Sequence, residues 1–396
     1  MRKNILVVVQ DFPYPLDYAG PIDSYNKIKA LHENGFNVYL VATIKEQVKD
    51  EYMDVMNKFC IIIQLVHRQH SVKNLFSLLP FQMKSRINEH DIYKIRHAMA
   101  EVNFDDVICD GYYGIELMRR LVVLQKIENI FLRVNNNEIK YFYALFKSTK
   151  NIFKKMYYIS DMVKFYIHES FVLPKIGITA MLHVSYDEKE SYEIKFPNYE
   201  HYFLPAAVDI TNINEYKKSD NKKVLFIGSL FMPNNVEALI WYIENVHGAL
   251  TKCYSDYSLI VAGNVRGADI NNLEKLFSRW KNISFVKSPK DLTALYDEAM
   301  IFINPMLNGA GVKLKTLNAI CAGVPVVSTI IGNEGTGLVK DKHILVTSDK
   351  DIFYKYVTLL MENENKRKDL VNNGQKFLTD TYNQTVVLQK IFCTAQ

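Results

Sequence analysis

The sequence contains no uninterrupted apolar run of the roughly 18 residues that a membrane-spanning helix requires. Its N-terminus, MRKNILVVVQD, starts with basic residues, but the apolar run covers only Ile5 to Val9 and ends before Gln10 and Asp11. This pattern predicts a first β-strand rather than a signal peptide. We therefore expect a cytoplasmic protein, soluble or peripheral on the inner face of the plasma membrane.

Cysteine is scarce, and metal-binding patterns are missing. The cysteines are odd in number, far apart and mostly embedded in apolar runs: Cys60, Cys109, Cys253, Cys321 and Cys393. They indicate buried thiols in a reducing compartment, and no Cys/His cluster has zinc-ligand spacing. We also find no convincing Asp-x-Asp motif of a metal-dependent transferase. The sequence therefore predicts no bound metal and no cofactor.

The sequence also has no strong excess of basic or of acidic residues. The net charge is +5, from 48 basic and 43 acidic residues, which is modest for 396 residues. This does not indicate a nucleic-acid partner. No Gly-x-Gly-x-x-Gly follows the first strand, which argues against a Rossmann oxidoreductase, and no internal repeat at a fixed period is evident.

Apolar residues make up 48% of the chain, enough for sizeable cores in roughly two to three domains. The opening predicts a strand at Ile5 to Val9, a helix at Ile22 to Asn34 that stops at Gly35, and a strand at Val38 to Ala42. Further strands are predicted at Cys60 to Val66, Asp106 to Cys109, Ile130 to Val134 and Ile178 to Val184. The alternation of strands and helices predicts an α/β fold with doubly wound sheets.

The most linker-like tract, Asn212 to Lys223, is polar and follows Phe203-Leu204-Pro205. We place the domain boundary near Asp209. The predicted domains are residues 1–208 and 209–383, and residues 384–396 form a C-terminal helix.

The stretch from Asn304 to Thr329 carries the strongest pattern in the chain. A strand ends at Asn304-Pro305, a glycine loop follows at Asn308 to Gly311, an amphipathic run leads to Gly323, and a second apolar strand begins at Val324. Glycine lets backbone N–H groups approach an anion, and a helix start adds free donors. This pattern predicts a phosphate site, although an ordinary βαβ crossover with surface lysines has the same spacing.

Helical spacing assigns roles within the amphipathic run. Lys315 and Asn318 fall on one face a turn apart, and Lys313 points elsewhere. We predict that Lys315 meets a phosphate, that Asn318 meets a hydroxyl group such as that of ribose, and that Lys313 faces mostly solvent.

The run GAGVKLKTLNAICAGVPVVSTIIGNEGTGL resembles the donor-nucleotide segment of GT-B glycosyltransferases of the family 4 type (glycosyl transferases group 1), of the bacterial surface-polysaccharide kind. The resemblance continues through VLFIGSLFMPNNVEALIWY and FVKSPKDLTALYDEAMIFINP, so it spans most of Val224 to Leu338. It implies two Rossmann-like domains facing each other across a cleft, with a last helix that packs back on the first domain. It also implies sugar transfer from a nucleotide sugar held by the second domain. Asn318 stands where the family usually has the glutamate that holds the ribose.

Several donor-binding residues follow from the motifs and the resemblance together. We expect the backbone of Gly228-Ser229 near the donor phosphates and Arg266 as a second cation for the diphosphate. The backbone around Lys287 is expected to contact the nucleobase, and Glu334-Gly335 is expected to line the sugar subsite. The full predicted donor set is Gly228, Ser229, Arg266, Lys287, Gly309, Ala310, Gly311, Lys315, Asn318, Glu334 and Gly335.

The first domain is predicted to supply the acceptor side. The loop QDFPYPLDYAGP follows the first strand and offers Asp11 and Gly20, although a rigid surface turn explains its prolines equally. Asp110 closes another strand at the same kind of edge. The run RVNNNE resembles an Arg-Val-His-Asn-x-Glu stretch of some bacterial members, with Asn135 in place of the histidine; the residues that it contributes are Arg133, Asn135, Asn136 and Glu138.

The resemblance implies a metal-independent, retaining transfer in which Lys315 stabilises the leaving phosphate. An inverting enzyme would need a general base, for which Asp110, Asp11 and Glu138 are candidates. The expected partners are a nucleotide sugar of UDP or GDP type and a glycan or lipid-linked acceptor. The alternatives are a nucleotide-sugar 2-epimerase on the same fold and a non-catalytic nucleotide-binding protein, which the amides of Asn318 and Asn135 favour slightly.

Two stretches mix basic with aromatic or aliphatic residues: Lys73 to Arg86 and Lys147 to Phe165. Such patterns are compatible with peripheral contact with an anionic membrane. We favour the simpler interpretation, an ordinary amphipathic helix with a solvated lysine face.

Overall fold

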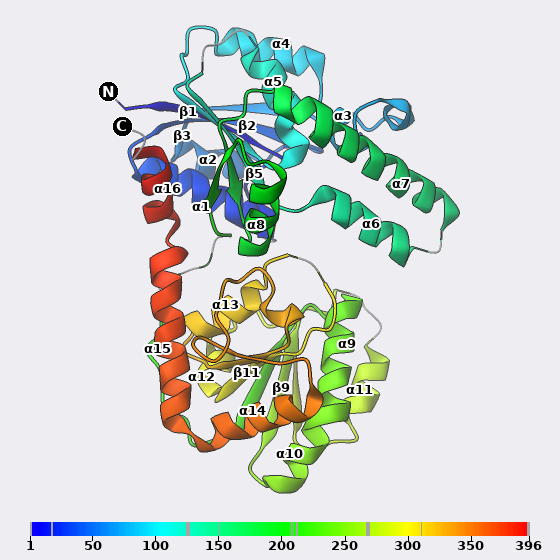
Figure 1. Cartoon of the computed structure of the whole chain (residues 1–396), viewed down its shortest axis with the longest axis vertical. Coiled ribbons are helices and arrows are strands. Elements are labelled where there is room, and N and C mark those ends of the chain that lie inside the picture. Colours follow the sequence, from blue (N-terminus) through cyan, green and yellow to red (C-terminus); the bar gives the residue numbers. More distant parts are fainter. Residues whose placement is uncertain are drawn as a thin grey trace. The chain divides into compact units, whose positions relative to one another are not determined.

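The computed structural model describes residues 2–16, 19–123, 127–149, 151–206, 208, 210, 213–266, 270–309 and 311–393. The chain divides into two compact units (Figure 1). The first combines Met1–Ala207 with Gln384–Gln396, and the second is Val208–Asn383. Asp209, where we placed the boundary, lies outside the described residues.

A seven-stranded parallel sheet forms the centre of the first unit, in the order β3-β2-β1-β4-β5-β6-β7. Its strands are β1 (Asn4–Val9), β2 (Asn37–Ile44), β3 (Cys60–His67), β4 (Asp106–Asp110), β5 (Asn129–Val134), β6 (Ala180–His183) and β7 (Glu200–Phe203). The central strand β1 is buried on both faces, as its unbroken apolar run predicts. The strand order reverses between β1 and β4, so their carboxyl ends open a crevice of the kind in which such sheets bind ligands.

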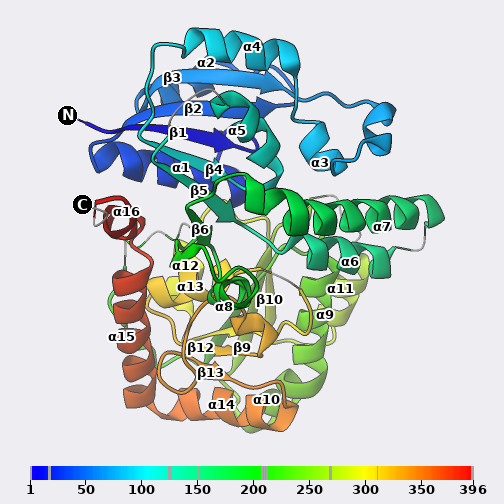
Figure 2. The same ribbon diagram turned by 45° about the horizontal axis from the view of Figure 1, so that its top comes forward.

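Helices cover both faces of this sheet (Figures 1 and 2). They are α1 (Ala19–Glu33), α2 (Asp50–Asn57), α3 (Phe81–Lys84), α4 (Glu89–Ala98), α5 (Ile115–Val122), α6 (Glu138–Ser148), α7 (Ile152–Ile167), α8 (Tyr186–Lys195) and α16 (Gln384–Cys393), with short turns η1 (Val72–Phe76), η2 (Tyr112–Gly114), η3 (His168–Val172) and η4 (Leu173–Lys175). The predicted stop of α1 at Gly35 is confirmed. Gly35 has a φ of 86° and donates to the carbonyl of His32, and Phe36 donates to that of Leu31.

The C-terminal helix α16 belongs to the first unit and packs beside α1. The Asn34 side chain donates to the carbonyl oxygen of Thr385 over 3.0 Å, and the Phe392 ring lies 4.5 Å from that of Phe131, centroid to centroid. The end of the chain thus completes the core beneath β5.

The second unit contains a six-stranded parallel sheet in the order β10-β9-β8-β11-β12-β13. Its strands are β8 (Lys223–Ile227), β9 (Ser258–Gly263), β10 (Ile283–Lys287), β11 (Ile301–Asn304), β12 (Val326–Ser328) and β13 (Leu345–Val346). Its helices are α9 (Pro233–Tyr242), α10 (Gly248–Cys253), α11 (Asn271–Phe277), α12 (Thr293–Glu298), α13 (Leu314–Cys321), α14 (Lys350–Glu362) and α15 (Glu364–Thr381), with turns η5 (Ile243–His247) and η6 (Ile331–Asn333). Here the order reverses between β8 and β11.

Two edge strands, β7 and β13, were not predicted. β7 (sequence EHYF) is partly exposed and β13 has only two residues, so neither gives an apolar run to detect. No helix within the described ranges is both long and apolar enough to cross a bilayer.

Candidate functional site

A pocket of about 360 Å³ lies at the carboxyl ends of β8 and β9 in the second unit. We call it the β8 pocket; its lining residues are Ile227, Gly228, Ser229, Asn235, Gly263, Asn264, Pro289, Leu292 and Lys315. Three of the predicted donor-binding residues, Gly228, Ser229 and Lys315, therefore share one wall.

Lys315 is the cation of this pocket. Its ammonium donates to the Asn235 side-chain oxygen over 2.8 Å and lies 5.2 Å from the centre of the Phe226 ring. Burial, together with the nearby charge of Lys313, lowers the pKa of Lys315 to about 7. Within the described residues no carboxylate lies within ion-pairing distance of it. The pocket thus holds a poorly solvated cation that no described carboxylate neutralises, and an anionic ligand would stabilise it.

Glycine permits the close approach of the β8 and β9 ends. A Cβ on Gly263 would lie 1.9 Å from the carbonyl oxygen of Gly228. The N–H of Gly228 donates to the Ala262 carbonyl over 3.0 Å, which ties the two strand ends together. The Gly228 amide is therefore engaged with the end of β9, although Gly228 and Ser229 both line the pocket.

We predict that Gly263→Ala destroys the β8 pocket, because the added methyl group must displace backbone rather than a flexible side chain. Thermal unfolding should shift to lower temperature by several degrees, and nucleotide binding should be lost. Gly228→Ala is the milder comparison, because the atoms nearest to its Cβ belong to the Asn235 side chain, at 3.1–3.2 Å, rather than to backbone. Equal behaviour of the two variants would contradict this packing argument.

Lys313 does not face solvent as we predicted. Its side chain is buried, and its ammonium donates to the Gly311 carbonyl over 2.7 Å and lies 3.3 Å from Glu334. Burial lowers the pKa of Lys313. The lysine therefore fixes the glycine loop, in which Gly309 and Gly311 have φ values of 125° and 81°. Ala310 lies outside the described residues.

The other predicted donor residues that the structure describes do not line the β8 pocket. Arg266 is exposed and stacks over Phe231 at 5.4 Å, and Lys287 is exposed and pairs with Glu274. Asn318 is exposed one turn beyond Lys315 on α13, and Gly335 is buried with a φ of 74°. The structure thus gathers Gly228, Ser229 and Lys315 but not the whole predicted set.

A second pocket, of about 290 Å³, lies in the first unit where β1 and β4 end. We call it the β1 pocket; its lining residues are Gln10, Asp11, Gly20, Pro21, Asp23, Ser24, Asp110, Tyr113, Asn135, Asn136, Glu138, Val184 and Ala206. All the residues predicted for the acceptor side line it, apart from Arg133.

Glu138 is an acid of the β1 pocket with a shifted pKa. It is the first residue of α6, is buried, and accepts a short hydrogen bond from the Tyr113 hydroxyl. Burial raises the pKa of Glu138 to about 7, although the Tyr113 hydroxyl opposes the shift. The Arg86 guanidinium lies over the Tyr113 ring at 5.2 Å. A carboxyl group that titrates near neutrality is suited to handling a substrate hydroxyl.

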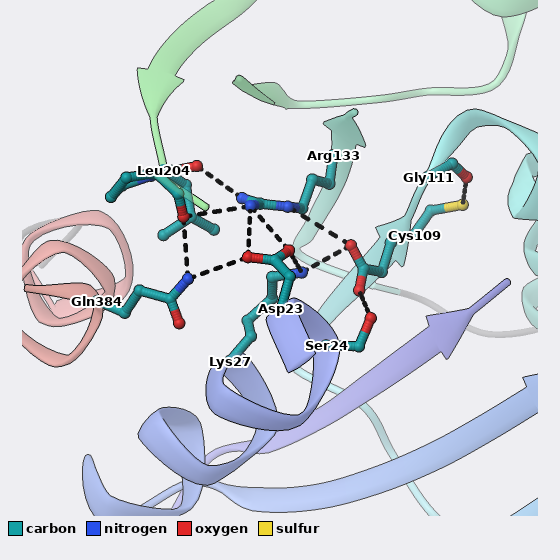
Figure 3. Close-up of polar contacts among 10 residues, drawn as sticks. Asp23, Ser24, Lys27, Cys109, Gly111, Arg133, Leu204 and Gln384 are labelled. Carbon is teal, nitrogen blue, oxygen red and sulfur yellow. Dashed lines mark hydrogen bonds and ion pairs between the residues drawn. The ribbon is translucent and has the colours of Figure 1, made fainter. Parts of the chain in front are cut away.

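Asp110 is held in a buried ion-pair network by Lys27 and Arg133, which Figure 3 labels. Lys27 on α1 lies 2.6 Å from one carboxylate oxygen, and the Ser24 hydroxyl donates to the other over 2.6 Å. Arg133 lies 3.6 Å from the same carboxylate and 2.9 Å from Asp23. With both oxygens engaged by charged or hydroxyl donors, Asp110 is better suited to positioning α1 than to the catalytic role we predicted.

The structure also corrects the role of Arg133. Its side chain is fully buried, and its guanidinium donates to the carbonyl oxygens of Leu204 and Pro205 as well as to Asp23. It supports the pocket from within the core and does not reach an acceptor. Gln384, the first residue of α16, donates to Asp23 and Pro205, which joins the C-terminal helix to this network.

Four site residues were missed by sequence reasoning: Asn235, Tyr113, Asp23 and Lys27. Asp23 and Lys27 are an i, i+4 pair on the first helix, which is a detectable signal. Asn235 and Tyr113 follow strand ends but stand in no distinctive motif, so only the fold reveals them.

Comparisons with known proteins agree with this geometry. The family described as Glycosyl transferases group 1 matches residues 221–363. An uncharacterized 44.6 kDa protein in the cps region of Klebsiella pneumoniae is 34% identical over 401 residues, covering 98% of this chain and 99% of its own. The O-antigen biosynthesis glycosyltransferase WbnH of Escherichia coli is 24% identical over 188 residues, 45% of this chain and 51% of its own.

Among solved structures, Alr3699/HepE of Anabaena in complex with UDP and glucose superimposes with a TM-score of 0.63. The match covers 99% of this chain and 98% of that one at 12% identity, so it shows the fold alone. Together with the two parallel sheets and the pockets at their switch points, these likenesses decide the family. The chain belongs to the group 1 glycosyl transferases and is a glycosyltransferase of GT-B architecture.

Proposed function

We propose that this enzyme transfers a sugar from a UDP- or GDP-type nucleotide sugar to a hydroxyl group of a glycan or lipid-linked acceptor in surface polysaccharide synthesis. Two relatives support this pathway: one is the protein in the cps region of Klebsiella pneumoniae, and the other is the O-antigen biosynthesis glycosyltransferase WbnH. A lipid-linked acceptor is presented at a membrane, so we place the enzyme in the cytoplasm, at the inner face of the plasma membrane.

The observation that carries the proposal is Lys315 in the β8 pocket. A diphosphate leaving group gains negative charge as the bond from phosphate oxygen to sugar breaks, and a fixed cation stabilises that charge in the transition state. Because no carboxylate of the described residues forms an ion pair with Lys315, its positive charge is available to bind the phosphate. This chemistry requires no metal or cofactor.

The transfer is proposed to retain the anomeric configuration. The bond between the sugar and the diphosphate breaks, the acceptor oxygen forms the new bond on the same face, and its proton passes to the leaving phosphate. No side-chain nucleophile is needed. Glu138 would then accept a hydrogen bond from the acceptor hydroxyl and orient it.

This role predicts a dependence on pH. Below about 7 the Glu138 carboxyl is protonated and no longer accepts that hydrogen bond, so the rate should fall as the pH falls through 7. Tyr113→Phe removes a donor to the ionised form, which raises the pKa of Glu138 and should move the acidic limb of the rate profile to higher pH. Glu138→Gln should lower kcat roughly 100-fold. An acidic limb that Tyr113→Phe leaves unchanged would contradict the assignment.

The proposed reaction is tested by incubating the full chain with UDP- and GDP-sugars and bacterial lipid extract. Release of one nucleoside diphosphate that depends on acceptor, with a product of retained configuration by NMR, is expected. Conversion of the donor to its 2-epimer without a glycoside would identify the epimerase alternative. Nucleotide binding without any turnover across the donor panel would favour the non-catalytic alternative.

A further inference from the structure

Helix α7 carries an unpartnered apolar stripe. Ile152, Met156, Ile159 and Val163 follow one another at intervals of four, three and four residues, which places them on one face. Their exposed fractions lie between 43% and 62%. The opposite face, with Asp161 and Phe165, is buried in the first unit. One side of the helix therefore packs on the core of the first unit, whereas the apolar stripe on the other side is exposed.

A second apolar segment lies against this helix. Phe76 and Leu78 in and after η1 are 87% and 94% exposed. The Lys164 ammonium donates to the Leu75 carbonyl over 2.8 Å, and the Asp161 carboxylate accepts from the Phe81 N–H over 2.9 Å. These bonds fix the segment to α7, which Figures 1 and 2 show extending away from the sheet beside α6. We call the joint surface of η1, Leu78 and α7 the apolar surface.

The charges around the apolar surface have one sign. The sequence has no aspartate or glutamate at residues 68–88 or at residues 139–160. Lys73, Lys147 and Lys154 are exposed, whereas Asp161 and Glu169 are buried. The simpler interpretation that we favoured, a solvated lysine face, accounts for Lys154 on the far side of α7 but not for the exposed apolar stripe.

We propose that the apolar surface docks the enzyme on an anionic lipid bilayer, with the helix lying in the interface and the exposed lysines of the adjoining segments, Lys73 and Lys147, at the headgroups. Apolar side chains that enter the acyl boundary and lysines that meet anionic lipid are the two contributions that hold such a helix. With 16 residues, α7 is too short to span the hydrocarbon core. A second copy of this chain fits less well, because a two-fold contact would place these lysines against each other without an acid to pair them.

The proposed membrane docking depends on this surface and not on the donor chemistry, so an experiment can reject the docking or the proposed sugar transfer separately. Its test is flotation of the full chain with phosphatidylcholine vesicles that contain, or lack, about one third phosphatidylglycerol. Binding only to the anionic vesicles is expected. The double variant Phe153→Glu, Met156→Glu and the double variant Phe76→Glu, Leu78→Glu should each bind at least about tenfold more weakly.

The matched control is Ile194→Glu on α8, where the isoleucine is 84% exposed but lies outside the apolar surface. It should bind vesicles like the wild type. Nucleotide binding, measured on the same samples, should be unchanged in all variants and shows that they are folded. Absence of binding to anionic vesicles, equal binding by the variants, or a wild-type dimer that both double variants dissociate without lipid would overturn the proposal.

Discussion

Lys315→Met is expected to lower kcat/KM for the nucleotide sugar by roughly a hundredfold to a thousandfold, because it removes the cation that faces the growing charge of the leaving phosphate. The same variant should be at least as stable as the wild type. Burial lowers the pKa of Lys315 to about 7, so at neutral pH the folded protein holds a charge that water would solvate better. A methionine side chain of similar length avoids that cost, so the free energy of unfolding should rise by about 1 kcal/mol.

The sign of the pH effect follows from the same shift. Between about pH 7 and the ordinary lysine pKa of about 10.4, the unfolded chain holds the Lys315 proton and the folded chain releases it, so this residue makes stability rise with pH there. Lys315→Met should remove that rise. Denaturant unfolding at pH 7 and pH 9, for the variant and the wild type, measures it directly.

The control for these effects is Lys376→Met on α15, whose lysine is exposed and pairs with Asp380 on the surface. It should change neither kcat/KM nor the dependence of stability on pH. If Lys315→Met kept full activity, the leaving phosphate would have to be stabilised elsewhere. If it lost stability by several kcal/mol, the lysine would be a structural residue.

Lys27→Met should destabilise the first unit by about 3–5 kcal/mol. Lys27 is buried 2.6 Å from Asp110 and 3.3 Å from Asp23. Its loss removes a close cation from the buried Asp110 carboxylate and the half-buried Asp23 carboxylate, while Arg133 stays 3.6 Å and 2.9 Å from them. Lys29→Met, two residues away on the same helix, is the control. Lys29 pairs with Glu33 at 3.8 Å on the surface, and such pairs contribute at most about 1 kcal/mol.

The two tryptophans make the location of this effect measurable. Trp241 and Trp280 both lie in the second unit, so their fluorescence reports on that unit, whereas circular dichroism reports on both. Lys27→Met should lower the midpoint of the transition seen by circular dichroism more than that seen by fluorescence. Equal midpoints for Lys27→Met and Lys29→Met would show that the buried network contributes no stability.

Much of the fold could be predicted because its strands are buried on both faces and leave continuous apolar runs, as β1 and β8 do. The strand ends then located Asp11, Asp110 and Glu138 at the β1 pocket and Gly228 at the β8 pocket, whereas helical spacing located Lys315. Short edge strands lack such runs and were missed.

Side-chain roles were harder to predict than positions. Asp110 and Arg133 stand at strand ends, where binding residues are expected. However, Lys27 and Asp23 from helix α1 form ion pairs with them, so both belong to a buried network. Lys313 was assigned to solvent from helical spacing, yet it precedes α13 and folds back on the glycine loop. Contacts between segments far apart in sequence decided the cases of Asp110 and Arg133, and a local contact with the Gly311 carbonyl contributed to that of Lys313.

The central claim is that the second unit holds a nucleoside diphosphate through Lys315. Calorimetric titration of UDP and GDP into the wild type and Lys315→Ala tests it most directly. The account predicts that one nucleotide binds the wild type, with affinity that weakens above pH 7 as Lys315 loses its proton, and that the variant binds roughly 10-fold to 100-fold more weakly. Equal affinity of the two proteins, or no binding of either nucleotide to the wild type, would contradict it.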